Sequence, residues 1–184
     1  MISKITLTTQ RLLLRPISPN DAEAIFHYRS DVKTNRFQGW IPKSIEDVHY
    51  FINNRVSPFI DQNGTWFQFA VTLKQDGEFI GDIGLHFFDK ENKQVEIGCT
   101  LSKDYHGKGY AAEAMEEILN YLFLVLNKHR IIASVDPRNK SSIRLVKRLH
   151  LRKEAHFKES IFSDGKWTDD FIFAILKSEW SRME

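Results

Sequence analysis

The chain has 184 residues, of which 42% are apolar and 27% are charged, and its formal net charge is +2. This length and composition predict one globular domain over residues 1–184, and the nearly balanced charge argues against a dedicated nucleic-acid-binding protein. A single cysteine, Cys99, excludes an intrachain disulfide and a cysteine metal cluster, so we expect no metal. No signal-type or membrane-length apolar run occurs, which predicts a cytoplasmic protein with no membrane partner.

Apolar periodicity and turn residues predict strands and helices in alternation along the chain. In order, these are a strand at 5–17, helices at 18–31 and 44–56, strands at 65–73, 77–88 and 94–101, a helix at 109–127, a strand at 130–135, a helix at 139–150, and a hairpin of two strands at 157–176. Ser44 and Asp47 have the spacing of a capping box at the start of the second helix. The order indicates a mixed α/β fold (α+β) rather than a regular doubly wound one.

One turn between a strand and a helix contains Gly107 and Gly109 around Lys108. A Walker-type phosphate loop is excluded, because Ser102 stands where that loop needs glycine and Gly109 where it needs serine or threonine. Gly107, Gly109 and Ala112 fit a dinucleotide fingerprint, but the following strand ends without the acid that binds a ribose hydroxyl. A turn without a ligand is a further alternative. The favoured interpretation is a pyrophosphate bound at the helix N-terminus, which the glycines leave open.

Six segments, in their order and spacing, carry a resemblance that covers nearly the whole chain. They are TQRLLLRPISPNDAEAIF, RFQGWIP, IGDIGL, EIGCTLSKDYHGKGYAAEA, VDPRNKSSIRLVKRL and FSDGKWTDDFIFAILKSEW. With these segments the chain resembles GNAT-superfamily N-acetyltransferases of the RimJ/RimL type. The resemblance implies a twisted mixed sheet of about seven strands, flanked by about four helices. Its strands at 94–101 and 130–135 would splay apart and admit acetyl-CoA as cosubstrate.

The resemblance also implies which residues bind the cofactor. The pyrophosphate loop would comprise His106, Gly107, Lys108, Gly109, Tyr110 and Ala111. The backbone of Cys99 and Leu101 would pair with the pantetheine arm, and Asn139 would hydrogen-bond the same arm. Ser142 would lie near the thioester sulfur. His106 stands where the family often has glutamine or arginine, so a backbone role is expected there rather than a side-chain role.

The implied chemistry is direct attack of a neutral primary amine on the thioester. Neutralising a lysine amine at pH 7 costs roughly 4–5 kcal/mol and an α-amine about 1 kcal/mol, so a general base helps. Glu96 is the candidate catalytic base, because it projects from the strand lining the gap and Gly98 leaves space beside it; the alternative is a structural ion pair. His86, across the hairpin, is a second candidate with a suitable pKa, although a lone strand histidine is more often structural. Val146 stands where many relatives have a proton-donating tyrosine, so Ser142 or water would assist the thiolate.

Other residues have both a functional and a structural interpretation. Phe37, Trp40 and Ile41 would line the acceptor site or simply anchor a surface loop. A second set follows one helix face and would meet the adenosine 3′-phosphate or solvent: Arg144, Lys147 and Arg148. Cys99 is expected to be a small buried residue rather than a nucleophile.

Further structural expectations concern packing. Helical spacing predicts one apolar face comprising Ala111, Met115, Ile118, Leu122 and Val125, and the last strand is expected to bury Trp167 and residues 171–176. His150 stands where the family usually has a glycine that permits an unusual backbone angle after a helix.

The expected function is therefore acetyl transfer to an amine acceptor, with a protein N-terminus suggested by the RimJ/RimL resemblance. Polyamine or aminoglycoside acetylation is an alternative, although the basic segment containing Lys33, Arg36 and Lys43 disfavours a polycationic acceptor. A non-catalytic coenzyme A-binding module is another alternative, supported by the missing tyrosine. A homodimer is an expected partner state, since members of the family are often dimers.

Overall fold

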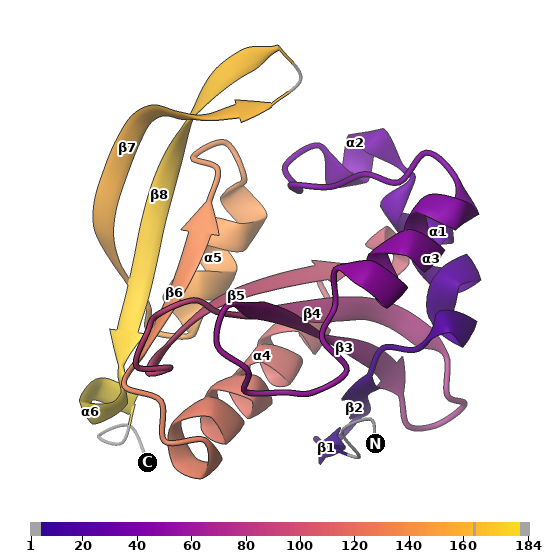
Figure 1. The fold of residues 1–184 in the computed structure, drawn as a ribbon, viewed down its shortest axis with the longest axis horizontal. Helices are drawn as coiled ribbons and strands as arrows, with labels where there is room; N and C mark the ends of the chain where they lie inside the picture. The colour runs from indigo at the N-terminus through magenta and orange to yellow at the C-terminus, as the bar shows by residue number, and fades with distance from the viewer. Residues whose placement is uncertain (1–4, 164, 181–184) are drawn as a thin grey trace.

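The computed structural model describes residues 5–163 and 165–180 (Figure 1). In chain order the elements are β1 (Leu7–Thr8), β2 (Leu12–Pro16), α1 (Ala22–Arg29), α2 (Val32–Asn35), α3 (Ile45–Asn54), β3 (Thr65–Leu73), β4 (Phe79–Phe87), β5 (Gln94–Leu101), α4 (Tyr110–Asn120), β6 (Arg130–Val135), α5 (Lys140–Arg148), β7 (Arg152–Ser163), β8 (Lys166–Leu176) and α6 (Lys177–Trp180). The described strands form one 8-stranded sheet in the order β1-β2-β3-β4-β5-β6-β8-β7. None of the described helices has the length and apolar character that a membrane span requires.

The sheet opens between its two central strands. β5 and β6 run parallel and pair only at Gln94–Arg130, Val95–Ile131 and Glu96–Ile132. Beyond Glu96, β5 continues along β4 as far as Leu101, whereas β6 continues along β8 as far as Val135. The two strands therefore diverge because each follows a different antiparallel neighbour, which confirms the predicted splay.

Two arms rise on either side of this divergence (Figure 1). Helices α1, α2 and α3 form one, here called the helical arm. Strand β6, helix α5 and the long β7–β8 hairpin form the other, the hairpin arm. Helix α4 crosses the opposite face of the sheet and buries Ala114, Met115, Ile118 and Leu119 against it. The apolar 3.6-residue period of α4 and the alternation of the strands thus build one main core.

A buried ion pair fixes the helical arm to the sheet. Arg29, at the end of α1, donates from Nη2 to both carboxylate oxygens of Asp82 on β4, at 2.7 and 2.8 Å. Gln68 Nε2 donates to the same carboxylate at 2.7 Å. Both charged side chains are buried, so removing either partner would leave the other charge uncompensated in a low-dielectric site.

The structure corrects three of the expected elements. The single strand at 5–17 is two strands, because the chain turns at Thr9, whose N–H bonds to Leu12 O. The helix at 109–127 changes to π winding over Tyr121–Val125, which rotates Val125 out of the apolar face and leaves it 66% exposed. Trp167 is 58% exposed rather than buried, because the end of the β7–β8 hairpin extends beyond the sheet core.

Helix α5 ends with a histidine in a left-handed conformation. His150 has φ +62°, its N–H bonds to Lys147 O, and the N–H of Leu151 bonds to Val146 O. These two bonds are those of a Schellman cap, in which glycine is the usual residue at the left-handed position. Histidine adopts this angle at a cost that glycine does not bear.

We therefore predict that His150→Gly stabilises the fold by about 1 kcal/mol, measured by urea unfolding. The imidazole is exposed, so its removal should cost little packing. His150→Ala is the matched control, because it removes the ring but keeps the strained angle. A His150→Gly variant no more stable than His150→Ala would contradict this account of the cap.

Candidate active site

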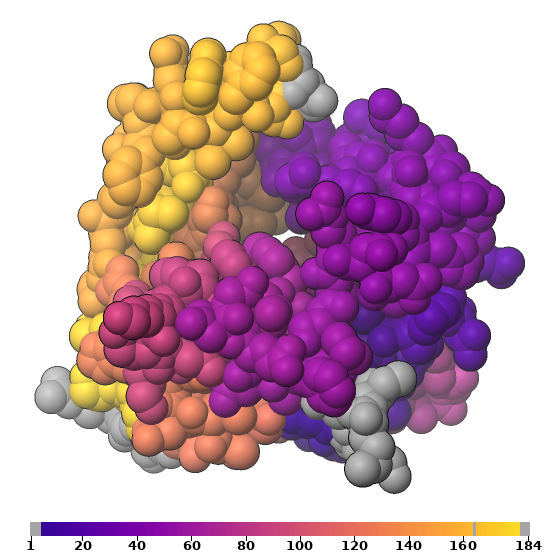
Figure 2. Space-filling view, in the orientation of Figure 1, coloured from indigo at the N-terminus to yellow at the C-terminus, as the bar shows by residue number. Residues whose placement is uncertain are grey.

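A cleft of about 870 Å³ lies where β5 and β6 diverge. Figure 2 shows the molecule hollowed between the helical arm and the hairpin arm. The lining combines the end of β5, the turn after it, the start of α4, the start of α5 and the segment following α2. Of the residues expected to bind the cofactor, those in the lining are Cys99, Leu101, His106, Gly107, Gly109, Tyr110, Ala111, Asn139 and Ser142. Lys108 and Glu96 lie outside this lining.

The N-terminus of α4 opens into the cleft. Gly107 and Gly109 have φ of +75° and +83°, so both require the left-handed region that glycine tolerates. A Cβ placed on Gly107 would meet nothing within 4 Å, which shows open space in front of the turn. The first bond within the helix runs from Glu113 N to Gly109 O, so the N–H groups of Tyr110 and Ala111 precede the helical ladder. This arrangement suits an anion such as a pyrophosphate.

Arg11, which the sequence analysis did not assign to the site, holds this turn in place. Its Nη1 donates to Lys108 O at 3.0 Å and its Nε donates to Glu113 Oε2 at 2.6 Å. The guanidinium also lies 4.3 Å from the ring centroid of Tyr110. The only signal for this role was the position of Arg11 within the TQRLLLRP segment, because its partners are about a hundred residues away.

The edge of β5 that faces the gap carries the backbone groups of Cys99 and Leu101. Ser102 N–H bonds to Ile80 O, so Ser102 directs its backbone N–H and C=O groups toward β4. Successive residues of a strand direct these groups to opposite sides, so those of Leu101 and Cys99 point toward the gap. Leu101 O accepts a hydrogen bond of 2.9 Å from His106 Nε2. The histidine therefore has a side-chain contact that the sequence analysis did not expect: it ties the glycine turn to the end of β5.

Asn139 and Ser142 lie across the cleft at the start of α5. Asn139 is the N-cap of this helix, and its Oδ1 accepts a bond from Ser142 N at 3.1 Å. Val146, one turn further on, is buried in the main core and does not line the cleft. The side chain at the family's tyrosine position is thus a packing residue here.

A second cavity of about 1290 Å³ lies on the other side of β5. Its walls come from α3, from Trp40 and Ile41, and from Trp66 on β3. Gly84 and Gly98, paired across β4 and β5, form part of its floor. Gln38 and Thr100 belong to the lining of both spaces, so the cleft and this cavity adjoin at β5.

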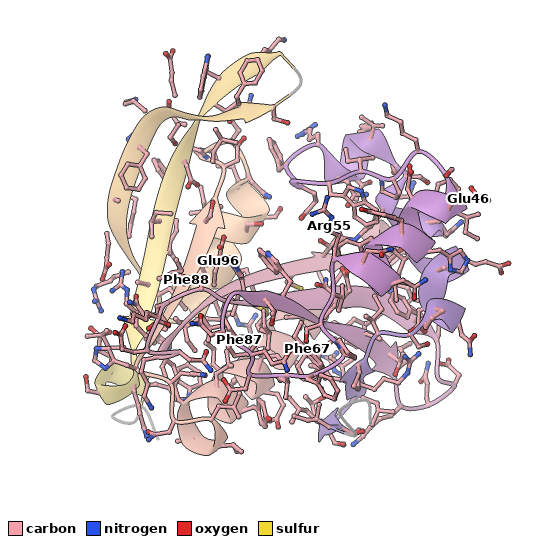
Figure 3. All side chains as sticks on the ribbon, in the orientation of Figure 1. Glu46, Arg55, Phe67, Phe87, Phe88 and Glu96 are labelled. Carbon is pink, nitrogen blue, oxygen red and sulfur yellow. The ribbon has the colours of Figure 1, made fainter. Side chains whose placement is uncertain are left out.

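Glu96 and His86 form a pair beside the point of divergence. His86 Nδ1 lies 3.5 Å from Glu96 Oε2, and both side chains are partly exposed. The ring of Trp66 stacks on His86 with centroids 4.6 Å apart and planes 6° apart. In Figure 3, Glu96 lies on the sheet beneath the space between the two arms. The two candidate bases thus lie in contact, as the structural ion-pair alternative for Glu96 also expects, and neither belongs to the lining of the cleft or of the second cavity.

The Cys99 side chain is unsuited to nucleophilic chemistry. Burial raises the pKa of its thiol to about 12, and the negative charge of Asp82 adds to the effect. The thiol is therefore neutral at physiological pH, as expected for a small packing residue.

The basic and aromatic candidates divide between the two spaces. Arg144 and Arg148 line the cleft, whereas Lys147 does not. Phe37 also lines the cleft, and the Arg138 guanidinium lies 5.7 Å from its ring centroid, joining the two arms.

Within residues 5–163 and 165–180, no group of three or more His, Cys, Asp or Glu side chains could hold a metal ion.

Known proteins resemble this chain along nearly its whole length. A family model described as an acetyltransferase (GNAT) domain matches residues 11–152. The chain is 34% identical over 178 residues to the uncharacterized N-acetyltransferase YnaD of Bacillus subtilis, which covers 95% of this chain and 99% of that protein. It is 26% identical over 186 residues to the ribosomal protein uS5-alanine N-acetyltransferase of Escherichia coli, covering 98% of this chain and 95% of that protein.

Solved structures share the fold. An acetyltransferase of the GNAT family from Bacillus anthracis superposes with a TM-score of 0.85 at 31% identity, covering 95% of this chain and all (100%) of that one. The spermidine N-acetyltransferase from Vibrio cholerae, solved with CoA and spermine, gives 0.76 at 21% identity, covering 92% and 98%. The splayed sheet and the open helix N-terminus agree with these matches, and the chain therefore belongs to the GNAT family of N-acetyltransferases.

Proposed function

We propose that this N-acetyltransferase is of the RimJ/RimL type and acetylates the α-amine of a peptide N-terminus by direct attack on acetyl-CoA. The observation that carries the proposal is the junction of two spaces at β5. A cleft suited to coenzyme A lies on one side, and a cavity open to an acceptor lies on the other. Gln38 and Thr100 border both.

The cleft fits coenzyme A at three places. The pyrophosphate is held by the α4 N-terminus, where the open space at Gly107 leaves room for close approach and Gly109 adopts the left-handed angle of the turn. The pantetheine pairs with the backbone edge at Cys99 and Leu101, where Leu101 O already accepts the His106 hydrogen bond, and Asn139 bonds it from the opposite side. When bound, acetyl-CoA supplies the activated acetyl thioester.

Charge in the cleft supports the same assignment. Five cationic side chains line it: Lys33, Arg36, Lys103, Arg144 and Arg148. The acid among the lining residues is Asp31, whose carboxylate accepts bonds from Lys33 N at 3.0 Å and Thr34 Oγ1 at 2.7 Å. Its charge is thus committed to the start of α2, and the cleft remains attractive to phosphates.

Glu96 accepts the proton of the attacking amine, directly or through water. His86 holds the carboxylate from one side, and Trp66 fixes the plane of the imidazole. Deprotonating an α-amine at pH 7 costs only about 1 kcal/mol, so one partly exposed carboxylate is a sufficient general base. Ser142 lies near the sulfur of the leaving thiolate and assists it with a hydrogen bond in place of a tyrosine.

The chemistry of the acceptor cavity favours a peptide over a polyamine. Its described lining contains Arg29, Lys43 and Arg55 but only one acid, Asp47. A polycation would be repelled by the unpaired members of this set. The uS5-alanine N-acetyltransferase is 26% identical over 98% of the chain, and the spermidine enzyme is 21% identical over 92%, so the choice between acceptors rests on the charge of the cavity.

The first test is a thiol-release assay with acetyl-CoA and matched acceptors. We expect turnover with peptides that have a free N-terminus, and at least tenfold lower kcat/KM with N-terminally blocked lysine peptides, spermidine or an aminoglycoside, because their amines cost more to neutralise or carry repelled charge. Fastest turnover of spermidine would contradict the peptide assignment.

The second prediction concerns the base. Glu96→Gln should lower kcat about tenfold at pH 7, in line with a deprotonation cost of about 1 kcal/mol, while the affinity for coenzyme A, measured by calorimetry, stays at the parental value. The loss should shrink as pH approaches the pKa of the acceptor amine, because the amine then loses its proton without help. His86→Gln is the companion variant and should have a smaller effect. Equal kcat for Glu96→Gln and the parent across the pH range would rule out this role.

The third prediction concerns the histidine of the turn. His106→Ala should weaken coenzyme A binding about fivefold, because the hydrogen bond that ties the turn to Leu101 O is lost. His106→Gln should bind nearly as well as the parent, since its amide can donate to the same carbonyl. Identical dissociation constants for the alanine and glutamine variants would show that the ring does not position the turn.

A further inference from the structure

The acceptor cavity carries positive charge that no carboxylate of the described chain neutralises. Lys43 and Arg55 line it, and neither has an ion-pair partner within residues 5–163 and 165–180. The third cation, Arg29, is already neutralised by Asp82 at 2.7 Å. Lys43 and Arg55 are therefore the cations of this wall whose charge no carboxylate of the described chain compensates.

The one acid of the lining is committed elsewhere. Asp47 Oδ2 accepts bonds from the backbone N–H groups of Lys43 at 2.8 Å and Ser44 at 3.1 Å. It lies in the first turn of α3, where the helix dipole is positive. These contacts hold the carboxylate at the start of α3, and within residues 5–163 and 165–180 it forms no ion pair with Arg55.

Arg55 is placed to meet a ligand in the cavity. It directly follows α3, its backbone N–H bonds to Phe51 O, and its guanidinium lies 5.9 Å from the Tyr50 ring centroid. In Figure 3 it lies on the inner side of the helical arm, across the gap from Glu96. The planar fork of an arginine matches a carboxylate in two parallel hydrogen bonds, which a lysine cannot reproduce.

Aromatic side chains surround these cations. Trp40 stacks on Phe51 with centroids 4.5 Å apart, and both rings belong to the cavity wall together with Trp66. Lys43 and Arg55 are themselves exposed, so a carboxylate paired with them stays in contact with solvent and the pair is sensitive to salt.

From this arrangement we infer that the enzyme selects acceptors that carry a carboxylate close to the reactive amine, with Arg55 as the principal specificity residue and Lys43 as its support. The inference rests on the proposed function of the site. The amine lies beside Thr100, where the cavity adjoins the cleft, and the carboxylate lies toward the end of α3. At about 1290 Å³ the cavity exceeds the needs of a free amino acid, so an acidic side chain next to a peptide N-terminus is the favoured source.

The test compares peptides that are identical except at the second residue, which is aspartate, asparagine or lysine, and adds free aspartate as the small-molecule arm. With the parent enzyme we expect kcat/KM for the aspartate peptide to exceed that for the asparagine peptide by about tenfold, chiefly through KM. The lysine peptide should be poorer still. The preference should decline as salt is raised, because screening weakens charge pairs.

Variants identify the residue responsible. Arg55→Gln should reduce the aspartate-to-asparagine ratio to about one, and Arg55→Lys should restore part of it. Lys166→Gln removes one positive charge from an exposed position on β8 outside both cavities, so it should retain the parental ratio. A better rate with free aspartate than with the peptide would move the carboxylate source to a small molecule and contradict the peptide assignment.

The outcomes separate this inference from the function on which it rests. If the parent acetylates peptides but shows no preference for aspartate, or if Arg55→Gln keeps the preference, the specificity inference is overturned while the acetyltransferase assignment to peptides stands. If no peptide or amine yields free thiol, the proposed peptide function fails and the inference fails with it.

Discussion

The divergence of β5 from β6 after Glu96 is the constraint on which the rest of the structure depends. A backbone edge inside a sheet is normally paired, and unpaired buried N–H and C=O groups are costly. Here the edge at Cys99 and Leu101 faces the cleft, and the ring of His106 satisfies one carbonyl. The remaining groups are available to an extended ligand, so the break in the sheet creates a binding surface.

The splay persists because each diverging strand is held from its other side. β5 is paired with β4 through Leu101, and β6 is paired with β8 through Val135. The buried Arg29–Asp82 pair anchors the helical arm to β4. The two arms thus rest on separate halves of the sheet, and the space between them does not depend on a single loop.

In the function proposed here, the divergence also separates the cofactor from the acceptor. The cofactor side has the α4 N-terminus and a basic lining, both of which stabilise phosphate groups. The proposed acceptor side has aromatic walls, a glycine floor and two cations, Lys43 and Arg55, that have no carboxylate partner among the described residues. The two spaces adjoin at Thr100, whereas Glu96 stands at the last position where β5 pairs with β6 and lies outside the lining of both.

The sequence by itself determined the local elements and the family, because periodicity, caps and glycines act over a few residues. Ser44 capping α3, the left-handed Gly107 and Gly109, and the strained His150 were all readable in this way. Only the tertiary structure decided the contacts between distant segments. Arg11 reaches Lys108 and Glu113, His86 meets Glu96, and π winding turns Val125 outward. These depend on strand register and side-chain reach, which no local pattern specifies.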